Sequence, residues 1–140
     1  MSLSVRHFRG RKGQALAEFA LILPVLFLLI AGIIEFGRGW NIKQALTDAS
    51  REGARYAVVQ DNTMTIAGVQ AKVNQRLALA GITGATVDVT PTANFHTTNS
   101  TMTVTVSTRY RMGWVGAMMQ WAGGSNTITI SSSTTMRNEY

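Results

Sequence analysis

GQALAEFALILPVLFLLIAGIIEFGRGW, residues 13–40, is the most apolar stretch of this 140-residue chain. Sixteen consecutive residues between Glu18 and Glu35 carry no charge. A helix needs about 20 apolar residues to cross the roughly 30 Å hydrocarbon core of a bilayer. The run reaches that length once residues 14–17 are included. It therefore predicts a transmembrane helix over residues 14–36.

The segment in front of this helix is basic. Residues 1–13 contain Arg6, Arg9, Arg11 and Lys12 and no acidic residue. Basic flanks stay on the cytoplasmic side of a membrane, so we expect residues 37–140 outside the cytoplasm. The rest of the chain has nine basic and seven acidic residues, only +2 of the formal charge of +6. This balance does not favour a nucleic-acid partner.

Residue types that carry enzymatic chemistry are scarce. The chain has no Cys, and its two histidines, His7 and His96, are far apart. No His and carboxylate cluster has metal-ligand spacing, and neither G-x-S-x-G nor a phosphate loop occurs. We therefore expect no cofactor, no metal and no catalytic residues. Without disulfides, the core must be held by packing.

A processing motif joins the basic leader to the apolar run. Gly13 ends the leader, and Glu18 and Phe19 stand five and six positions after it. G-Q-A-L-A-E-F resembles the cleavage site of type IV prepilins, especially of the tight-adherence (Tad, or Flp) branch. The resemblance implies that a prepilin peptidase cuts between Gly13 and Gln14. A conventional signal cleaved near Gly39 would instead release a soluble protein, but its cleavage-site pattern is poorly matched.

Glu18 and Pro24 are the unusual residues of the membrane helix. Glu18 lies about 6 Å along the helix from Gln14, where a carboxylate is costly unless it is paired. Resemblance to pilins implies that it meets the charged N-terminal amine of a neighbouring subunit. The alternative is that Glu18 complements the helix N-terminus or reaches lipid headgroups. Pro24 lacks an N–H and predicts a bend, either harmless or a hinge.

The helical pattern continues beyond the membrane. Over residues 37–60, small and apolar residues recur every three or four positions, and no proline interrupts them. We expect one helix over residues 14–59, whose second half is the spine of an outer domain. Gly53 is predicted to let another element approach closely, because a mid-helix glycine costs about 1 kcal/mol relative to alanine.

A second motif lies in this spine. QALTDASREGARY at residues 44–56 follows EFALILP at residues 18–24, and the combination resembles the TadE-like family of minor pseudopilins. The resemblance implies a bacterial inner-membrane protein that initiates, primes or caps a Tad pilus. The implied partners are the prepilin peptidase, other pilins and minor pseudopilins, the Tad platform proteins and the assembly ATPase.

The charged residues of the second motif are candidates for a partner surface. They are Arg51, Glu52 and Arg55. The alternative is a solvated helix face. A different function also stays open, that of a static membrane-anchored binding module in an envelope secretion complex.

Residues 61–140 are expected to form an α+β extracytoplasmic domain. A second helix is predicted to begin after Thr63 or Thr65 and to stop at Gly81. Alternating patterns then predict three strands, over residues 86–90, 102–110 and 127–136. Short connections favour antiparallel pairing. The expected fold is α+β and pilin-like, with a long N-terminal helix, a second helix and a small antiparallel sheet of about three strands.

Large apolar residues gather between the last two strands, in MGWVGAMMQWAGG at residues 112–124. Trp114, Met118 and Trp121 share one face if this segment is a short helix. Core packing is the favoured role, since a small domain needs large residues inside. Docking on a partner and contact with the membrane interface are the alternatives.

Overall fold

The computed structural model describes residues 10–59, 65–91 and 100–138. Its elements, in chain order, are α1 (Gly10–Val59), α2 (Ile66–Leu79), β1 (Thr86–Thr90), β2 (Thr101–Arg111), α3 (Trp114–Trp121) and β3 (Thr127–Arg137). The long helix, the second helix and the three-stranded antiparallel sheet confirm the expected α+β, pilin-like fold. Leader residues 1–9, which include His7, and the candidates Thr63 and His96 lie outside the described residues.

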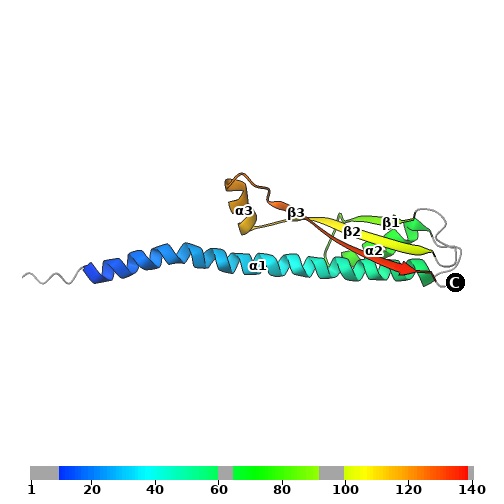
Figure 1. The fold of residues 1–140 in the computed structure, drawn as a ribbon, viewed down its shortest axis with the longest axis horizontal. Helices are drawn as coiled ribbons and strands as arrows, with labels where there is room; N and C mark the ends of the chain where they lie inside the picture. Colours follow the sequence, from blue (N-terminus) through cyan, green and yellow to red (C-terminus); the bar gives the residue numbers. More distant parts are fainter. Residues whose placement is uncertain (1–9, 60–64, 92–99, 139–140) are drawn as a thin grey trace, which may run out of the picture.

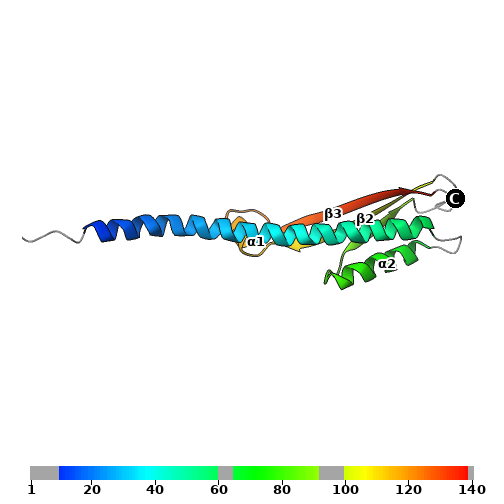
Figure 2. The same ribbon diagram turned by 90° about the horizontal axis from the view of Figure 1, so that it is seen from below.

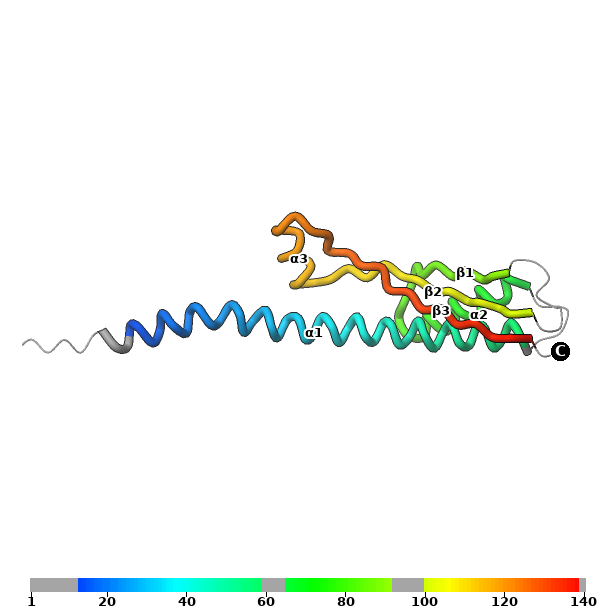
Figure 3. The backbone as a smooth tube through the Cα atoms, in the orientation of Figure 1, coloured from blue at the N-terminus to red at the C-terminus, as the bar shows by residue number. Residues whose placement is uncertain are grey.

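Helix α1 is a single helix of 50 residues, about 75 Å long at 1.5 Å per residue. It ends at Val59 as predicted and begins at Gly10, four residues before the predicted start. In Figure 1 most of its N-terminal half projects beyond the other elements, α3 lies near its middle, and its C-terminal half underlies the rest of the protein. The helix continues through Pro24 without a break, and Figure 3 shows a shallow bend in this projecting half.

The projecting half of α1 is exposed on nearly all sides. Only 11% of its most apolar 18-residue window is buried, so the rest of the chain does not cover it. Its length and composition would allow it to cross a membrane, and no other helix in the described residues meets that test. The large side chains that it exposes include Leu21, Val25, Leu29 and Ile33.

The C-terminal half of α1 carries the core. Its buried face consists of small residues around one leucine, namely Leu46, Ala49, Gly53, Ala54 and Ala57. Their three- and four-residue spacing places them on one side of the helix. That side packs against α2 and against the buried face of β2, which is formed by Met102, Val104 and Val106.

Helix α2 follows the prediction closely. The side chain of Thr65 caps it by accepting a hydrogen bond of 3.2 Å from the Gly68 amide. Its buried residues are Val69, Val73 and Leu77, one turn apart. Gly81 follows the helix with a φ of +73°, a conformation that favours glycine. Figure 2 shows α2 running alongside the C-terminal half of α1.

The sheet has the order β1-β2-β3 and is antiparallel throughout. Strands β2 and β3 pair along their whole length, from Thr101 opposite Arg137 to Arg111 opposite Thr127. Strand β1 covers only residues 103–107 of β2. The β2–β3 hairpin therefore overhangs β1, and Figures 1 and 3 show this overhang reaching back along α1 toward its projecting half.

Strand β3 meets α1 through hydroxyl groups. Thr47 Oγ1 lies 3.0 Å from Ser132 Oγ, and Ser50 Oγ lies 2.8 Å from Thr134 Oγ1. Lys43 adds a hydrogen bond from its ammonium to the Ser131 carbonyl. These pairs satisfy polar groups that the contact buries, so the polar inner side of β3 is compatible with close packing.

Replacing Gly53 with alanine should destabilise the outer domain. An added Cβ would overlap Val73 Cγ2 and lie 3.3 Å from Val104 Cγ1. Overpacking of this kind costs about 1–3 kcal/mol, and the better helix propensity of alanine returns about 1 kcal/mol of it. We expect Gly53→Ala to lower the thermal unfolding midpoint in detergent, followed by circular dichroism.

Gly37→Ala is the matched control, because an added Cβ there meets no atom within 4 Å. It should leave the midpoint unchanged or raise it slightly. Equal midpoints for the two variants would contradict the close-packing role of Gly53.

Candidate functional site

A buried carboxylate lies where the apolar half of α1 ends. Glu35 is 7% exposed. Its Oε1 accepts a hydrogen bond of 2.5 Å from the Tyr110 hydroxyl and one of 3.0 Å from the Gly113 amide. Both donors come from the β2 end of the hairpin overhang. The three groups form a clasp that ties the overhang to α1.

The Tyr110 hydroxyl stays protonated and can therefore donate its hydrogen bond to Glu35. Burial raises the pKa of the Tyr110 hydroxyl, and so does its hydrogen bond to Glu35. A phenol normally titrates near pH 10, so an upward shift keeps this hydroxyl protonated throughout the physiological range. Tyr110 therefore remains a donor to the carboxylate at any pH the protein is expected to meet.

Sequence reasoning missed this clasp. From the sequence, Glu35 is only the acidic residue that ends an apolar run, and Tyr110 is only the last residue of a predicted strand. Seventy-five positions separate them, so no local pattern joins the two. The available signal was a lone acid bordering a membrane segment, where a buried carboxylate requires donors.

Helix α3 lies next to the clasp and beside the projecting half of α1. The Trp114 ring packs edge-on against Phe27, with centroids 6.1 Å apart and planes at 86°. Ala31, between Phe27 and Glu35 on α1, is buried as well. Figure 1 shows α3 at the end of the overhang, away from the sheet and α2.

The favoured core-packing role for the Trp114 and Trp121 segment is wrong. Trp114 is 69% exposed and Trp121 is 92% exposed, and Gly116 is the only buried residue of α3. The physical reason is the length of β2 and β3. Their pairing extends past β1 and carries α3 beyond the core that these side chains were expected to fill.

The predicted processing residues are all exposed on the first turns of α1. They are Gly13, Gln14, Glu18 and Phe19. The Gln14 amide Nε2 donates a hydrogen bond of 3.0 Å to Glu18 Oε1. An added Cβ at Gly13 would meet nothing within 4 Å, so packing gives no reason for glycine at this position.

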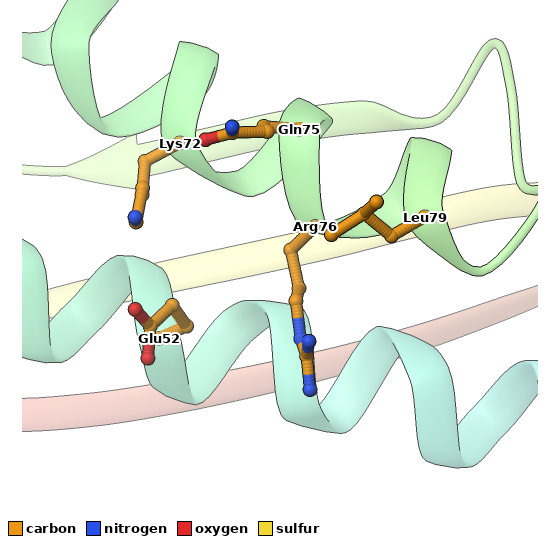
Figure 4. A pocket seen from close by; sticks show the side chains of 5 residues that line it. All are labelled: Glu52, Lys72, Gln75, Arg76 and Leu79. Atoms are coloured by element: carbon orange, nitrogen blue, oxygen red, sulfur yellow. The ribbon is translucent and has the colours of Figure 1, made fainter.

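The charged residues of the second motif differ in their surroundings. Arg51, Glu52 and Arg55 are all exposed. Glu52 lines a polar groove of about 340 Å³ between α1 and α2, together with Lys72, Gln75, Arg76 and Leu79. Figure 4 shows Lys72 extending from α2 toward Glu52. Glu52 thus faces a basic neighbour of its own chain.

Metal-ligating side chains do not gather anywhere in residues 10–59, 65–91 and 100–138. No group of three or more His, Asp and Glu is placed to hold an ion there.

These features define an α+β, pilin-like protein with one helix that could span a membrane. Residues 13–55 match the family described as TadE-like protein, which confirms the resemblance carried by the two motifs. The match covers less than half of the chain and lies entirely on α1. It associates this helix with the Tad pilus system. No curated protein and no solved structure matches the chain.

Removing the Tyr110 hydroxyl should loosen the clasp. Tyr110→Phe leaves Glu35 with one donor fewer, and a hydrogen bond to a charged group contributes about 1.5–3 kcal/mol. We expect the Gly113 amide to exchange with deuterium roughly 10- to 100-fold faster, since each 1.4 kcal/mol is about tenfold. Hydrogen exchange of the detergent-solubilised protein measures this change.

Tyr56→Phe makes the same chemical change elsewhere, at a residue packed beside the core. It should leave exchange at Gly113 unaltered. Unchanged exchange in Tyr110→Phe would show that the clasp does not hold the overhang in place.

Proposed function

We propose that this protein is a minor pseudopilin that takes part in the initiation, priming or capping of a Tad/Flp pilus. The observation that carries the proposal is the TadE-like match over residues 13–55. It falls on one continuous helix whose first half is apolar and exposed and whose second half is the spine of a folded domain. A pilin needs this division, because one helix must rest in lipid and later pack among other helices.

The proposed topology follows from the two ends of the apolar run. The basic leader stays in the cytoplasm, residues 14–36 cross the inner membrane, and the domain of α2 and the sheet lies outside. Prepilin peptidase removes residues 1–13. The lack of any packing role for Gly13 supports this proposal, since the fold of the chain gives no reason for a glycine on the first turn of α1.

Glu18 has a defined role in the proposal. Among the residues that the structure describes, its carboxylate accepts a hydrogen bond from the exposed Gln14 side chain. After cleavage the new α-amine at Gln14 is mostly protonated at neutral pH. We propose that, in the assembled pilus, Glu18 of one subunit pairs with this amine of the next, which offsets the cost of placing both charges among apolar helices.

The proposed role is structural and requires partners. These are the prepilin peptidase, other pilins and minor pseudopilins, the Tad platform proteins and the assembly ATPase. Glu52, which faces α2, is a weaker candidate for contact with them than Arg51 and Arg55, which do not line that groove.

The intact mass of the protein isolated from membranes tests the processing step. Loss of residues 1–13 is the expected result. Retention of the leader would favour a static membrane-anchored binding module. A mass equal to that of a chain that starts after residue 39 would indicate a conventionally secreted protein. Both of these outcomes contradict the proposal.

Glu18→Ala should leave membrane insertion intact and reduce pilus formation. The variant leaves the α-amine of the neighbouring subunit unpaired among apolar helices, and a loss of about 1.4 kcal/mol changes an equilibrium tenfold, so we expect pili to fall at least about tenfold. Counting pili by electron microscopy, with membrane fractionation in parallel, gives both readouts. Asp48→Ala, at an exposed residue on the outer half of α1, is the control. Normal piliation in Glu18→Ala would count against the pairing.

A further inference from the structure

Helix α3 contacts the part of α1 that is expected to lie in lipid. Trp114 packs against Phe27, and Gly113, directly before α3, bonds to Glu35; both partners lie inside the span of residues 14–36. At 1.5 Å per residue, Phe27 is about 14 Å along the helix from residue 36, nearly half of a 30 Å hydrocarbon core. If α1 crosses the membrane, a segment that touches Phe27 cannot remain in water.

The surface of α3 suits such a position. It exposes four large apolar or aromatic side chains, Trp114, Met118, Met119 and Trp121, beside a single polar one, the uncharged Gln120. An apolar groove of about 390 Å³ continues this surface between α1 and the overhang, and its lining includes Phe36, Trp40, Met112, Val115 and Ile128. Tryptophan is enriched where proteins meet the membrane interface.

Charge is absent from the tip of the overhang and present at its base. No Asp, Glu, Lys or Arg occurs between Arg111 and Arg137. Arg109 and Arg111 flank Tyr110 at the clasp, and Arg38 lies one turn beyond Glu35 on α1; all three are exposed. Arginine side chains can extend to lipid phosphates while the chain near them is in the apolar region.

The direction of α3 also fits a membrane surface. Figures 1 and 3 show α3 running across the axis of α1 instead of along it. A short helix perpendicular to a helix that spans the membrane lies roughly in the plane of the bilayer.

Backbone hydrogen bonds within the chain close the turns on either side of α3. Backbone N–H groups in hydrocarbon must find partners within the protein. In the turns on either side of α3, the bonded donors are Met112 to the Asn126 carbonyl, Gly113 to Glu35, Ala122 to the Met118 carbonyl, Gly123 to the Gln120 carbonyl and Gly124 to the Met119 carbonyl. These bonds lower the cost of taking the turns out of water, although the N-terminus of α3 has no side-chain cap.

We infer that the hairpin tip, residues 112–126, is inserted into the outer leaflet of the membrane beside α1. The occupant of its apolar surface is lipid. Arg38, Arg109 and Arg111 lie at the level of the phosphates, and the Glu35 clasp fixes the depth of the tip. This inference rests on the membrane orientation of α1 in the proposed function, but it assigns a second membrane contact to residues outside the TadE-like match.

Quenching of single tryptophans tests the inference. The full chain has three tryptophans, Trp40, Trp114 and Trp121, and variants that keep one each are made by changing the other two to Phe. Each variant is placed in phosphatidylcholine liposomes at a high lipid-to-protein ratio. Lipids brominated along the acyl chain report contact with hydrocarbon, and aqueous iodide reports contact with water.

Trp114 and Trp121 should lose fluorescence to the brominated lipids and resist iodide. Trp40 lies beyond residue 36, the end of the expected membrane span, and is the internal reference. Only lipids brominated near the headgroup should quench its fluorescence. Iodide quenching of Trp114 and Trp121 would overturn the inference. Resistance to both quenchers would also overturn it, because a second protein molecule would then cover the tip. Extraction with alkaline carbonate tests the anchoring of α1 separately, since release from the liposomes would contradict the proposed function instead.

A charged substitution gives an independent readout. In the variant that keeps only Trp121, Met119→Lys should shift the tryptophan emission to longer wavelength, because a charge on the hairpin tip opposes insertion of the tip. Thr135→Lys, on the exposed outer face of β3, is the matched control and should cause no shift. Circular dichroism checks that both variants fold. An identical emission in the two folded variants would overturn the inference.

Discussion

The packing of the C-terminal half of α1 against the sheet fixes the position of every other element. This contact uses alanine and glycine where most helix faces use larger residues, so the backbones of α2 and β2 approach closely. Val73 and Val104 already occupy the space beside Gly53, where a side chain would otherwise stand. A rotation of α1 would bring larger residues against them, so the contact tolerates little rotation. The hydrogen bonds between the hydroxyl groups of α1 and β3 also fix the orientation of β3 relative to α1. The axis of α1 and the direction of the β2–β3 hairpin are therefore coupled.

Because β2 and β3 are longer than β1, the hairpin that they form makes a second contact with α1. Strand β1 is 5 residues long, whereas β2 and β3 have 11 residues each. The unmatched part of the hairpin has no third strand beside it and follows α1 toward the apolar half. Glu35 meets it there with two donors, Tyr110 and Gly113. A hairpin shorter by a few pairs would end before it reached Glu35.

The sequence predicts the elements that rest on local periodicity. The end of α1, the stop of α2 at Gly81 and the three strands are correct within one residue at most ends, and Thr65 is one of the two residues predicted to cap α2. It does not predict the clasp or the exposure of Trp114 and Trp121, because these depend on how far one hairpin extends past its neighbour. Large apolar residues in a small domain favour a core role on composition alone. Composition does not distinguish a core from a surface that meets lipid.

The two carboxylates that border the apolar run differ in their partners. Glu35 is buried and receives two hydrogen bonds from its own chain, one of them from a backbone amide. Glu18 is exposed, and its bond comes from the adjacent turn of the same helix. A carboxylate that is satisfied within its own fold has no need of another molecule, whereas one that would enter an apolar environment with a single neutral donor does. This asymmetry supports the proposal that assembly contacts form at the N-terminal end of α1, while the outer end is occupied by the hairpin of the same chain.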